Sequence, residues 1–194
     1  MSEEQEKYVA GQSFVGLDLS LTSTGWSFKC GSNIQFGSIK TGPHDFSNDL
    51  ARMIHIRNEI LLKIPADVSM ICAEDFFSGP HAGSGTRLAM LAATVRIALY
   101  ERGKAFMIVA PTSLKKWITG KGVGQKDLIV REVYKRYGIE TANDDEADAV
   151  VLALIAEHFW KAQKKDCGDD FHKYQQEVVK GMLDTKGERG FNLG

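Results

Sequence analysis

The sequence is poor in cysteine and proline and has no long apolar run. Its three cysteines, Cys30, Cys72 and Cys167, form no C-x-x-C pair, which argues against a structural zinc site and a disulfide scaffold. No stretch reaches the ~18 unbroken apolar residues that a membrane-spanning helix requires. The first residues, MSEEQEKYVAGQ, are acidic and polar, unlike a secretory signal. These absences predict a cytoplasmic protein with reduced thiols and no membrane partner.

An excess of positive charge is also absent. The 24 Lys and Arg residues are balanced by 25 Asp and Glu residues, for a net charge of -1. DNA-binding domains are often strongly basic, so a nucleic-acid site on this chain has to be a local patch. Residues 115–136 form such a patch, with the basic residues Lys115, Lys116, Lys121, Lys126, Arg131, Lys135 and Arg136. A solvated helix face with its preceding loop is the alternative interpretation of this segment.

The 194 residues, 43% of them hydrophobic, are enough for one globular domain. Residues 1–12 are predicted to be a polar leader and 13–165 the folded domain. Residues 166–194 are mixed in charge, and we expect a polar tail there that could contain one helix over 170–183.

Apolar patterning predicts five strands and five helices within the folded domain. The strands are expected at 13–19, 25–30, 34–41, 68–74 and 105–110. The helices are expected at 48–64, 86–102, 112–118, 126–137 and 145–160. Thr112 or Ser113 is expected to cap its helix, and residues 83–86 are expected in a flexible loop. Three strands in a meander followed by alternating helices and strands favour a mixed sheet flanked by helices.

Two carboxylates directly follow apolar strands. Asp18 ends the run FVGLD, and Glu74 ends MICAE. A carboxylate beside a buried strand is expensive to desolvate unless it is paired or binds a metal, and sheet proteins place catalytic groups at strand ends. Capping of the following turn is the alternative role for Asp18. Asp75 is the rival of Glu74, although strand alternation would direct it to the opposite face.

A third acidic cluster, NDDEADAVVLAL, opens the last predicted helix. Asp145 and Asp148 are three residues apart and can share one helix face, and Asp144 with Asp148 is a second possible pair. Acids also stabilise a helix N-terminus through its dipole. That explanation suits Asp144, Asp145 and Glu146 better than Asp148, which lies beyond the cap and beside the apolar face.

These acids can together form an all-oxygen site. Carboxylates without His or Cys suit Mg²⁺ or Mn²⁺ rather than zinc. Two such ions about 4 Å apart can activate a water and stabilise a leaving oxygen in phosphodiester cleavage. The sequence therefore favours a metal-dependent nuclease.

In order and spacing, four segments resemble the RuvC-type Holliday junction resolvases of the ribonuclease H-like superfamily. They are GLDLSLTSTGW, ICAEDFF, LKKWITGKGVGQK and DEADAVVLA, and the resemblance covers residues 13–160. It implies an α/β, ribonuclease H-like fold with a mixed five-stranded sheet, in which a three-strand antiparallel meander is joined by two parallel strands. It also implies a homodimer that cuts four-way DNA junctions with two Mg²⁺ or Mn²⁺ ions per active site.

The resemblance also carries the family's functional residues onto this chain. The metal-binding acids fall on Asp18, Glu74, Asp145 and Asp148. The basic residues near the scissile phosphate fall on Lys115 and Lys126, with Lys116 as an alternative to Lys115. The aromatic residue near the junction centre falls on Phe77, and further DNA contacts are expected from Lys121 and Arg131. The apolar helix at 86–102 is a candidate dimer surface.

The chain departs from the family at three places. Bacterial members usually carry D-P-G at the first acid, where this chain has Asp18-Leu19-Ser20. The loop at 83–86 and the tail after 165 are also atypical of cellular enzymes. These departures suggest a divergent member, encoded by a bacteriophage or by a bacterium. It is expected to act in the bacterial cytoplasm, which for a phage protein is that of the host cell.

Three other functions remain as alternatives. The same acids could serve a nuclease that cuts RNA–DNA hybrids or flaps, and the fold could serve a non-catalytic DNA-binding protein. GLDLSLTSTG also resembles the phosphate-binding turn of actin-like ATPases and sugar kinases, but those need two such domains. GKGVG lacks the end of a Walker motif, so no nucleotide cofactor is expected. His158 is expected at a helix end without a function, and Trp117 and Trp160 in packing.

Overall fold

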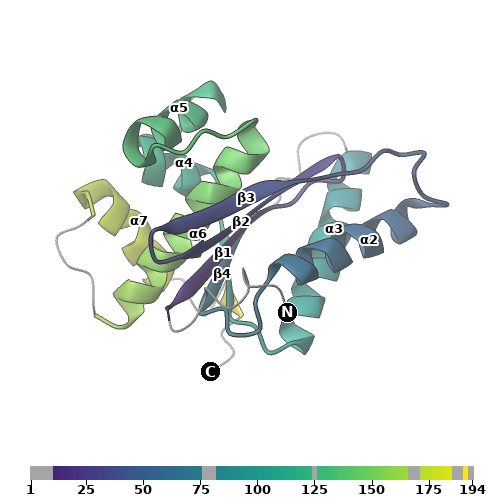
Figure 1. The fold of residues 1–194 in the computed structure, drawn as a ribbon, viewed down its shortest axis with the longest axis horizontal. Helices are drawn as coiled ribbons and strands as arrows, with labels where there is room; N and C mark the ends of the chain where they lie inside the picture. The colour runs from purple at the N-terminus through teal and green to yellow at the C-terminus, as the bar shows by residue number, and fades with distance from the viewer. Residues whose placement is uncertain (1–10, 76–81, 124–125, 166–170, 185–189, 192–194) are drawn as a thin grey trace.

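Six strands form one mixed sheet in the order β3-β2-β1-β4-β5-β6. The computed structural model describes residues 11–75, 82–123, 126–165, 171–184 and 190–191 (Figure 1). The antiparallel meander consists of β1 (Ser13–Asp18), β2 (Ser23–Cys30) and β3 (Asn33–Lys40). The parallel part adds β4 (Met70–Glu74) beside β1 and β5 (Phe106–Val109) beside β4. The five predicted strands and their arrangement are thereby confirmed.

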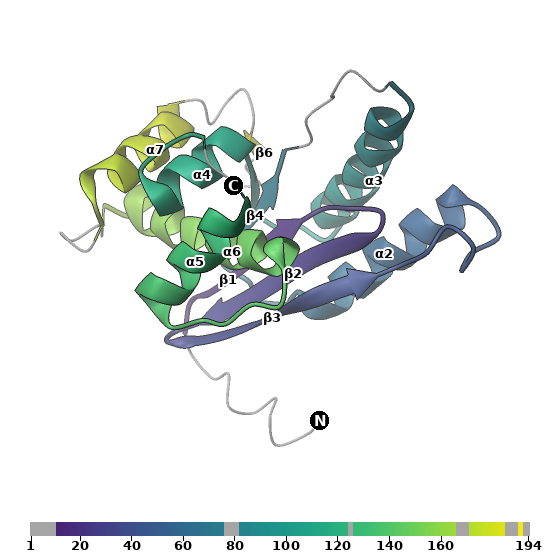
Figure 2. The ribbon, with the colours of Figure 1, turned by 90° about the horizontal axis from the view of Figure 1, so that it is seen from above.

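Helices cover both faces of this sheet. Their bounds are α2 (Asp49–Lys63), α3 (Ala82–Glu101), α4 (Pro111–Thr119), α5 (Lys126–Tyr137), α6 (Asp144–Gln163) and α7 (Lys173–Asp184). Figures 1 and 2 show α2 and α3 on one side of the sheet and α4 to α7 on the other. None of the described helices has the length and apolar composition needed to cross a membrane.

Strand alternation divides the core into two layers. In β1, Phe14 packs into the layer of α4, α5, α6 and α7, whereas Val15 and Leu17 pack into the layer of α2 and α3. In β4, Cys72 packs into the layer of α4 to α7, and Ile71 packs into the layer of α2 and α3. The central strands are buried on both faces because side chains at successive positions point to opposite sides. The sheet is thus fixed in register from both sides.

Helix α6 lies unusually close to the sheet at two glycines. A Cβ built on Gly16 of β1 would lie 2.0 Å from the carbonyl oxygen of Ala149, and one built on Gly25 of β2 would lie 2.0 Å from that of Asp145. Both distances are far below any van der Waals contact, so only glycine allows this approach. Gly25 pairs in register with Asp18. The contact therefore places the start of α6 directly beside the end of β1.

The start of α6 is fixed by two further polar contacts. The side chain of Asn143 accepts a hydrogen bond from the backbone N–H of Glu146 at 2.9 Å, which caps the helix. The Glu146 carboxylate accepts from the backbone N–H of Ala142 at 2.9 Å and from the hydroxyl of Ser38 at 3.2 Å. Glu146 is therefore a capping residue that also ties α6 to β3, as the dipole interpretation of this acid predicts.

Several boundaries differ from the predictions. A sixth, two-residue strand, β6 (Gly190–Phe191), pairs antiparallel with β5. The loop expected at 83–86 is instead the first part of α3, because extending the helix-forming stretch that follows costs far less than starting a new helix. The cap expected at Thr112 or Ser113 is wrong: α4 begins at Pro111, whose fixed φ and missing N–H suit the first helical position.

The predicted position of His158 at a helix end is also wrong. Helix α6 continues to Gln163, so His158 lies inside it, and its side chain is buried. Its Nδ1 accepts a hydrogen bond from the indole N–H of Trp117 at 3.1 Å, and its ring stacks on Phe171. Burial lowers the pKa of His158 to about 4, so the imidazole is neutral and free to accept this bond near pH 7. Trp117 is buried, which confirms its predicted role in packing.

The segment expected to be a polar tail contains α7, in agreement with the possible helix at 170–183. Four of its residues are buried, Gln175, Val178, Val179 and Met182. The three apolar ones join the same core layer as α4 and α6. Much of the apolar face of α7 is therefore part of the folded core.

Replacing glycine by alanine should have opposite effects on stability at two sites, one beneath α6 and one on α7. Gly25→Ala should lower the free energy of unfolding by about 3 kcal/mol or more, because the added methyl group meets backbone that cannot yield. A Cβ added at Gly181 of α7 would meet no atom within 4 Å. Gly181→Ala should therefore raise the free energy of unfolding by up to ~1 kcal/mol, because alanine favours a helix more than glycine does. Chemical denaturation measures both, and equal effects at the two sites would contradict this account.

Candidate active site

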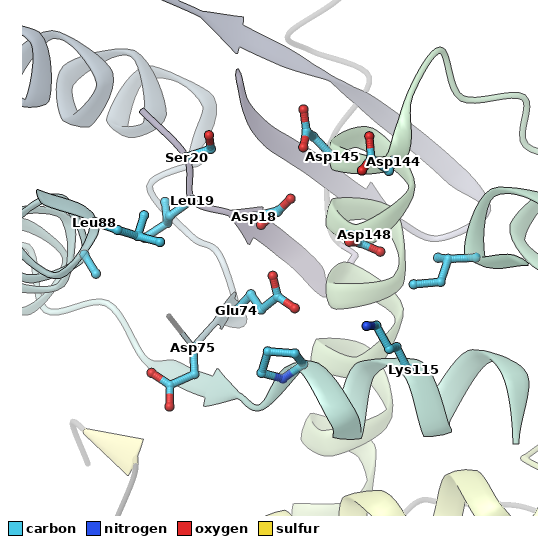
Figure 3. A pocket seen from close by; sticks show the side chains of 13 residues that line it. Asp18, Leu19, Ser20, Glu74, Asp75, Leu88, Lys115, Asp144, Asp145 and Asp148 are labelled. Carbon is cyan, nitrogen blue, oxygen red and sulfur yellow. The ribbon is translucent and has the colours of Figure 1, made fainter. Parts of the chain in front are cut away.

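A hollow of about 370 Å³ opens where the ends of β1 and β4 meet the start of α6 (Figure 3). Its polar lining is dominated by acids. The lining residues are Asp18, Leu19, Ser20, Glu74, Asp75, Leu88, Ala92, Pro111, Lys115, Ile129, Asp144, Asp145 and Asp148. The hollow thus brings together all four acids that the sequence singled out, together with one of the candidate lysines.

Three of these acids form a compact group. Asp18, Glu74 and Asp148 each offer one carboxylate oxygen, and these three oxygens lie within 4.8 Å of one another. Their elements are β1, β4 and α6, so the group exists only in the assembled fold. Figure 3 shows the three carboxylates pointing toward one another. Three oxygen donors at this spacing could hold a hard divalent cation.

The turn after Asp18 is built by hydroxyl side chains. The Thr24 hydroxyl donates to the carbonyl oxygen of Ser20 at 2.6 Å and accepts from the Ser20 N–H at 3.1 Å. The Ser20 hydroxyl in turn accepts from the N–H of Thr22 at 3.2 Å. These bonds replace backbone pairing at the strand end and hold the chain in a tight turn. Leu19 and Ser20 are thereby placed in the lining of the hollow.

A buried arginine ties this turn to the end of β3. Arg52 of α2 donates to the Thr41 hydroxyl at 2.9 Å, to the Thr41 carbonyl at 2.8 Å and to the Leu21 carbonyl at 2.5 Å. Sequence reasoning missed this residue, because a charged side chain on an amphipathic helix predicts solvent exposure. Arg52 supports the Asp18 turn from behind and does not line the hollow.

Mutual repulsion and burial act together on Asp18. The pKa of Asp18 is raised to about 8, and burial is the largest cause. The charge of Glu74, a hydrogen bond with Glu74 and the charges of Asp145 and Asp144 are the other causes. An acid group at this position is therefore hard to ionise unless positive charge is supplied. An all-carboxylate donor set that is destabilised by its own charge fits a divalent metal ion, whose binding would remove that destabilisation.

The acids of the helix start are not equivalent. Asp144 and Asp145 both line the hollow but lie outside the compact group of three. The charge of Asp145 raises the pKa of Asp18 more than that of Asp144 does. This favours Asp145 over Asp144 as a fourth acid.

Asp75 is oriented away from the group. Figure 3 shows its carboxylate pointing away from Asp18, Glu74 and Asp148. It forms an ion pair with Arg96 of α3, with Nη2 and Oδ1 3.2 Å apart. The expectation that alternation separates Asp75 from Glu74 is confirmed.

The two adjacent lysines are clearly separated. Lys115 lines the hollow, and in Figure 3 its ammonium group points toward the carboxylates. Lys116 lies on another side of α4 and pairs with Glu177 of α7, with Nζ and Oε2 3.1 Å apart. Of the two, only Lys115 is available to a group bound in the hollow.

The other candidate DNA contacts are more widely spread. Lys121 is exposed after α4, and Arg131 of α5 lines a second hollow of about 670 Å³ that shares Asp144 with the first. Lys126 is the first residue of α5, but its side chain lies outside the described part of the chain, and Phe77 lies outside it entirely.

The apolar rim of the hollow was not predicted. It consists of Leu19 after β1, Leu88 and Ala92 from α3, Pro111 from α4 and Ile129 from α5. Such residues carry no chemical signal in a sequence, because apolar helix positions are expected to pack in any core. They nevertheless form the apolar part of the wall around the carboxylates.

Comparison with known proteins identifies relatives of this chain. Residues 14–156 match a family model described as crossover junction endodeoxyribonuclease RuvC. A crossover junction endodeoxyribonuclease RuvC from Brachyspira hyodysenteriae is 26% identical over 145 residues, which are 72% of this chain and 90% of that relative.

Solved structures with a similar fold include RuvC from Thermus thermophilus. It matches with a TM-score of 0.62 at 18% identity, over 80% of this chain and 98% of its own. A structure of T. thermophilus RuvC in complex with Holliday junction substrate also gives a TM-score of 0.62 at 18% identity, over 80% of this chain and 97% of its own. The likeness confirms the predicted ribonuclease H-like arrangement of strands and helices.

The raised pKa of Asp18 predicts how stability depends on pH without metal. The folded protein keeps a proton that the unfolded chain, with an ordinary pKa of 3.8, has already lost. The free energy of unfolding should therefore fall as pH rises from about 4 to about 8. Asp18→Asn removes this loss, and we expect it to be more stable than the unsubstituted protein at pH 8 by about 1–3 kcal/mol.

Thermal unfolding in EDTA across this pH range measures the effect. Asp75→Asn is the matched control, because this carboxylate points away from the group and pairs with Arg96; it should show no stabilisation. A difference between Asp18→Asn and the unsubstituted protein that does not grow with pH would contradict the electrostatic account.

Proposed function

Because the chain belongs to the family of crossover junction endodeoxyribonucleases RuvC, we propose that it is a metal-dependent endonuclease that hydrolyses phosphodiesters at four-way (Holliday) DNA junctions. The observation that carries this proposal is the convergence of Asp18, Glu74 and Asp148 from β1, β4 and α6. The family match supplies the substrate class, and the convergence supplies a site that can perform the chemistry.

The carboxylates are the proposed metal ligands. Asp18, Glu74 and Asp148, with Asp145 as a fourth acid, would hold two Mg²⁺ or Mn²⁺ ions. Bound ions of this kind supply Lewis acidity toward the scissile phosphate and lower the pKa of the attacking water. The choice of Mg²⁺ or Mn²⁺ follows from the all-oxygen donor set.

The remaining residues of the hollow act on the phosphate and on water. Lys115, directed at the carboxylates, would offset negative charge that develops on the phosphate, and Lys126 is the second candidate for this role. Leu88 and Ile129 line the same hollow and would limit the access of bulk water to it. A partly dry site strengthens every charge interaction within it.

The basic segment gives the proposed path for the DNA backbone. Arg131 lines the second hollow, and Asp144 lines both hollows. Lys121, in the turn between α4 and α5, is exposed. Contacts of this kind go to phosphates and recognise shape rather than base sequence. Binding should therefore weaken steeply with rising salt concentration.

Two symmetric cuts require two copies of the site, and α3 offers a surface for a homodimer. Met90, Ile97 and Tyr100 are exposed on α3, with exposed fractions of 42%, 58% and 57%. The last two are separated by one helical turn, and Met90 lies two turns before Ile97, so all three share one face. An apolar stripe of this kind suits contact with the same stripe of a second copy.

Cleavage of defined DNA substrates tests the proposed activity. With Mg²⁺ or Mn²⁺, the protein should make paired, symmetric nicks in a four-way junction. Asp18→Asn should lower the rate by at least ~1,000-fold because it removes a proposed metal ligand. A gel assay with linear duplex, flap and RNA–DNA hybrid as parallel substrates measures both. Asp75→Asn should retain activity within about threefold.

The parallel substrates separate the alternatives. Cleavage of the RNA–DNA hybrid or the flap alone would support the proposed metal site but would contradict the proposal that the four-way junction is the substrate. Junction binding without cleavage of any substrate would reject the nuclease and favour a DNA-binding protein.

A second experiment tests the dimer surface. Ile97→Glu should convert the protein to a monomer, because a charge at the centre of an apolar contact typically costs about 2 kcal/mol or more. Light scattering measures the mass, and the junction assay should then show single nicks in place of paired ones. Leu62→Glu, at an exposed apolar residue of α2, is the matched control, and an Ile97→Glu protein that stays dimeric would reject this surface.

A further inference from the structure

Helix α7 lies beyond the residues that match the family model, which end at 156. It packs against α4 and α6 on the side away from the sheet (Figures 1 and 2). Val178, Val179 and Met182 share a core layer with Trp117 and Ile118 of α4. The helix that carries Lys115 is therefore held between the carboxylate hollow and α7.

One residue of α7, Tyr174, contacts both helices of the basic segment. A Cβ built on Gly120, which ends α4 in a left-handed conformation, would lie 3.7 Å from the Tyr174 ring, so the ring packs over this turn. The Tyr174 hydroxyl accepts a hydrogen bond from the guanidinium of Arg136 in the last turn of α5. Arg136 also donates to Glu132 at 2.9 Å, which fixes its own position. Tyr174 thus connects the end of α4 to the end of α5.

Two other contacts also connect α7 to the basic segment. Glu177 pairs with Lys116 on the side of α4 that faces α7. Neighbouring residues of a helix are about 100° apart around its axis, so a helix that turns Lys116 toward α7 turns Lys115 elsewhere, and here toward the hollow. The side chain of Gln175, which is buried, forms a hydrogen bond with Tyr137 of α5.

We propose that α7 fixes the orientation of α4 and α5 that directs Lys115 at the carboxylates, and that Tyr174 is the positioning residue in this arrangement. The proposal rests on the nuclease function argued above. The Lys116–Glu177 pair has exposed fractions of 39% and 51%, and such exposed pairs contribute little. Tyr174 contributes more, because its ring and its hydroxyl act on two different helices.

A double-mutant cycle tests whether Tyr174 acts through Lys115. Single-turnover cleavage of a four-way junction with Mg²⁺ would be measured for Tyr174→Ala, Lys115→Ala and the double variant. We expect Lys115→Ala to slow cleavage by about 100-fold and Tyr174→Ala by about tenfold. The double variant should be no more than about threefold slower than Lys115→Ala alone, because a misplaced lysine cannot matter once it is absent.

Two further variants separate positioning from loss of stability. Tyr174→Phe keeps the ring on Gly120 and loses only the bond to Arg136, so it should recover most of the rate. Lys180→Ala changes an exposed residue of the same helix and should cleave like the unsubstituted protein. Junction affinity, measured in Ca²⁺, should change less than the rate does in Tyr174→Ala. Rate losses that multiply in the double variant would overturn the proposal, because a merely structural role is independent of Lys115.

A readout without DNA distinguishes this proposal from the function on which it rests. Amine acetylation followed by mass spectrometry would compare Lys115 with Lys40, an exposed lysine of β3. In Tyr174→Ala the ratio of the two modification rates should change by at least about threefold, and in Lys180→Ala it should not. If the unsubstituted protein cleaves no DNA, the proposed nuclease function is wrong. The acetylation experiment then tests by itself whether Tyr174 positions Lys115. An unchanged ratio in Tyr174→Ala would overturn that role.

Discussion

The close contact between α6 and the sheet is the constraint on which the rest of the structure depends. Gly16 and Gly25 leave space for the backbone of α6 to lie directly on β1 and β2. With larger residues the helix would have to move outward, and Asp148 would move away from Asp18 and Glu74. Two missing side chains in the sheet therefore determine the geometry of three carboxylates. The capping bonds of Asn143 and Glu146 then fix where along the sheet the helix starts.

This arrangement places several carboxylates where burial makes their ionisation unfavourable. The raised pKa of Asp18 reflects this unfavourable free energy directly. The folded chain accepts the destabilisation because the sheet and helices around the site are held by two large apolar layers. A divalent cation bound among these carboxylates would remove the repulsion that the fold maintains between them.

Much of the fold could be predicted, because strand alternation and helical periodicity are local signals. The five main strands and the acids that end β1 and β4 follow from such patterns, and the family resemblance supplied their arrangement. Contacts between distant segments could not be predicted in the same way. Arg52 and Tyr174 resemble ordinary surface residues in the sequence, and only the fold brings them to the Asp18 turn and to the basic segment. The separation of Lys115 from Lys116 likewise depends on how α4 is rotated.

The origin of the three carboxylates in three distant segments has a consequence for the life of the chain. During synthesis Asp18 leaves the ribosome first and Glu74 follows, but Asp148 emerges about 130 residues after Asp18. A polypeptide that ends before Asp148 thus has at most two of the three acids and no complete site. The three carboxylates can therefore come together only after about three quarters of these 194 residues have been made, and a proteolytic fragment that lacks α6 has lost one of them.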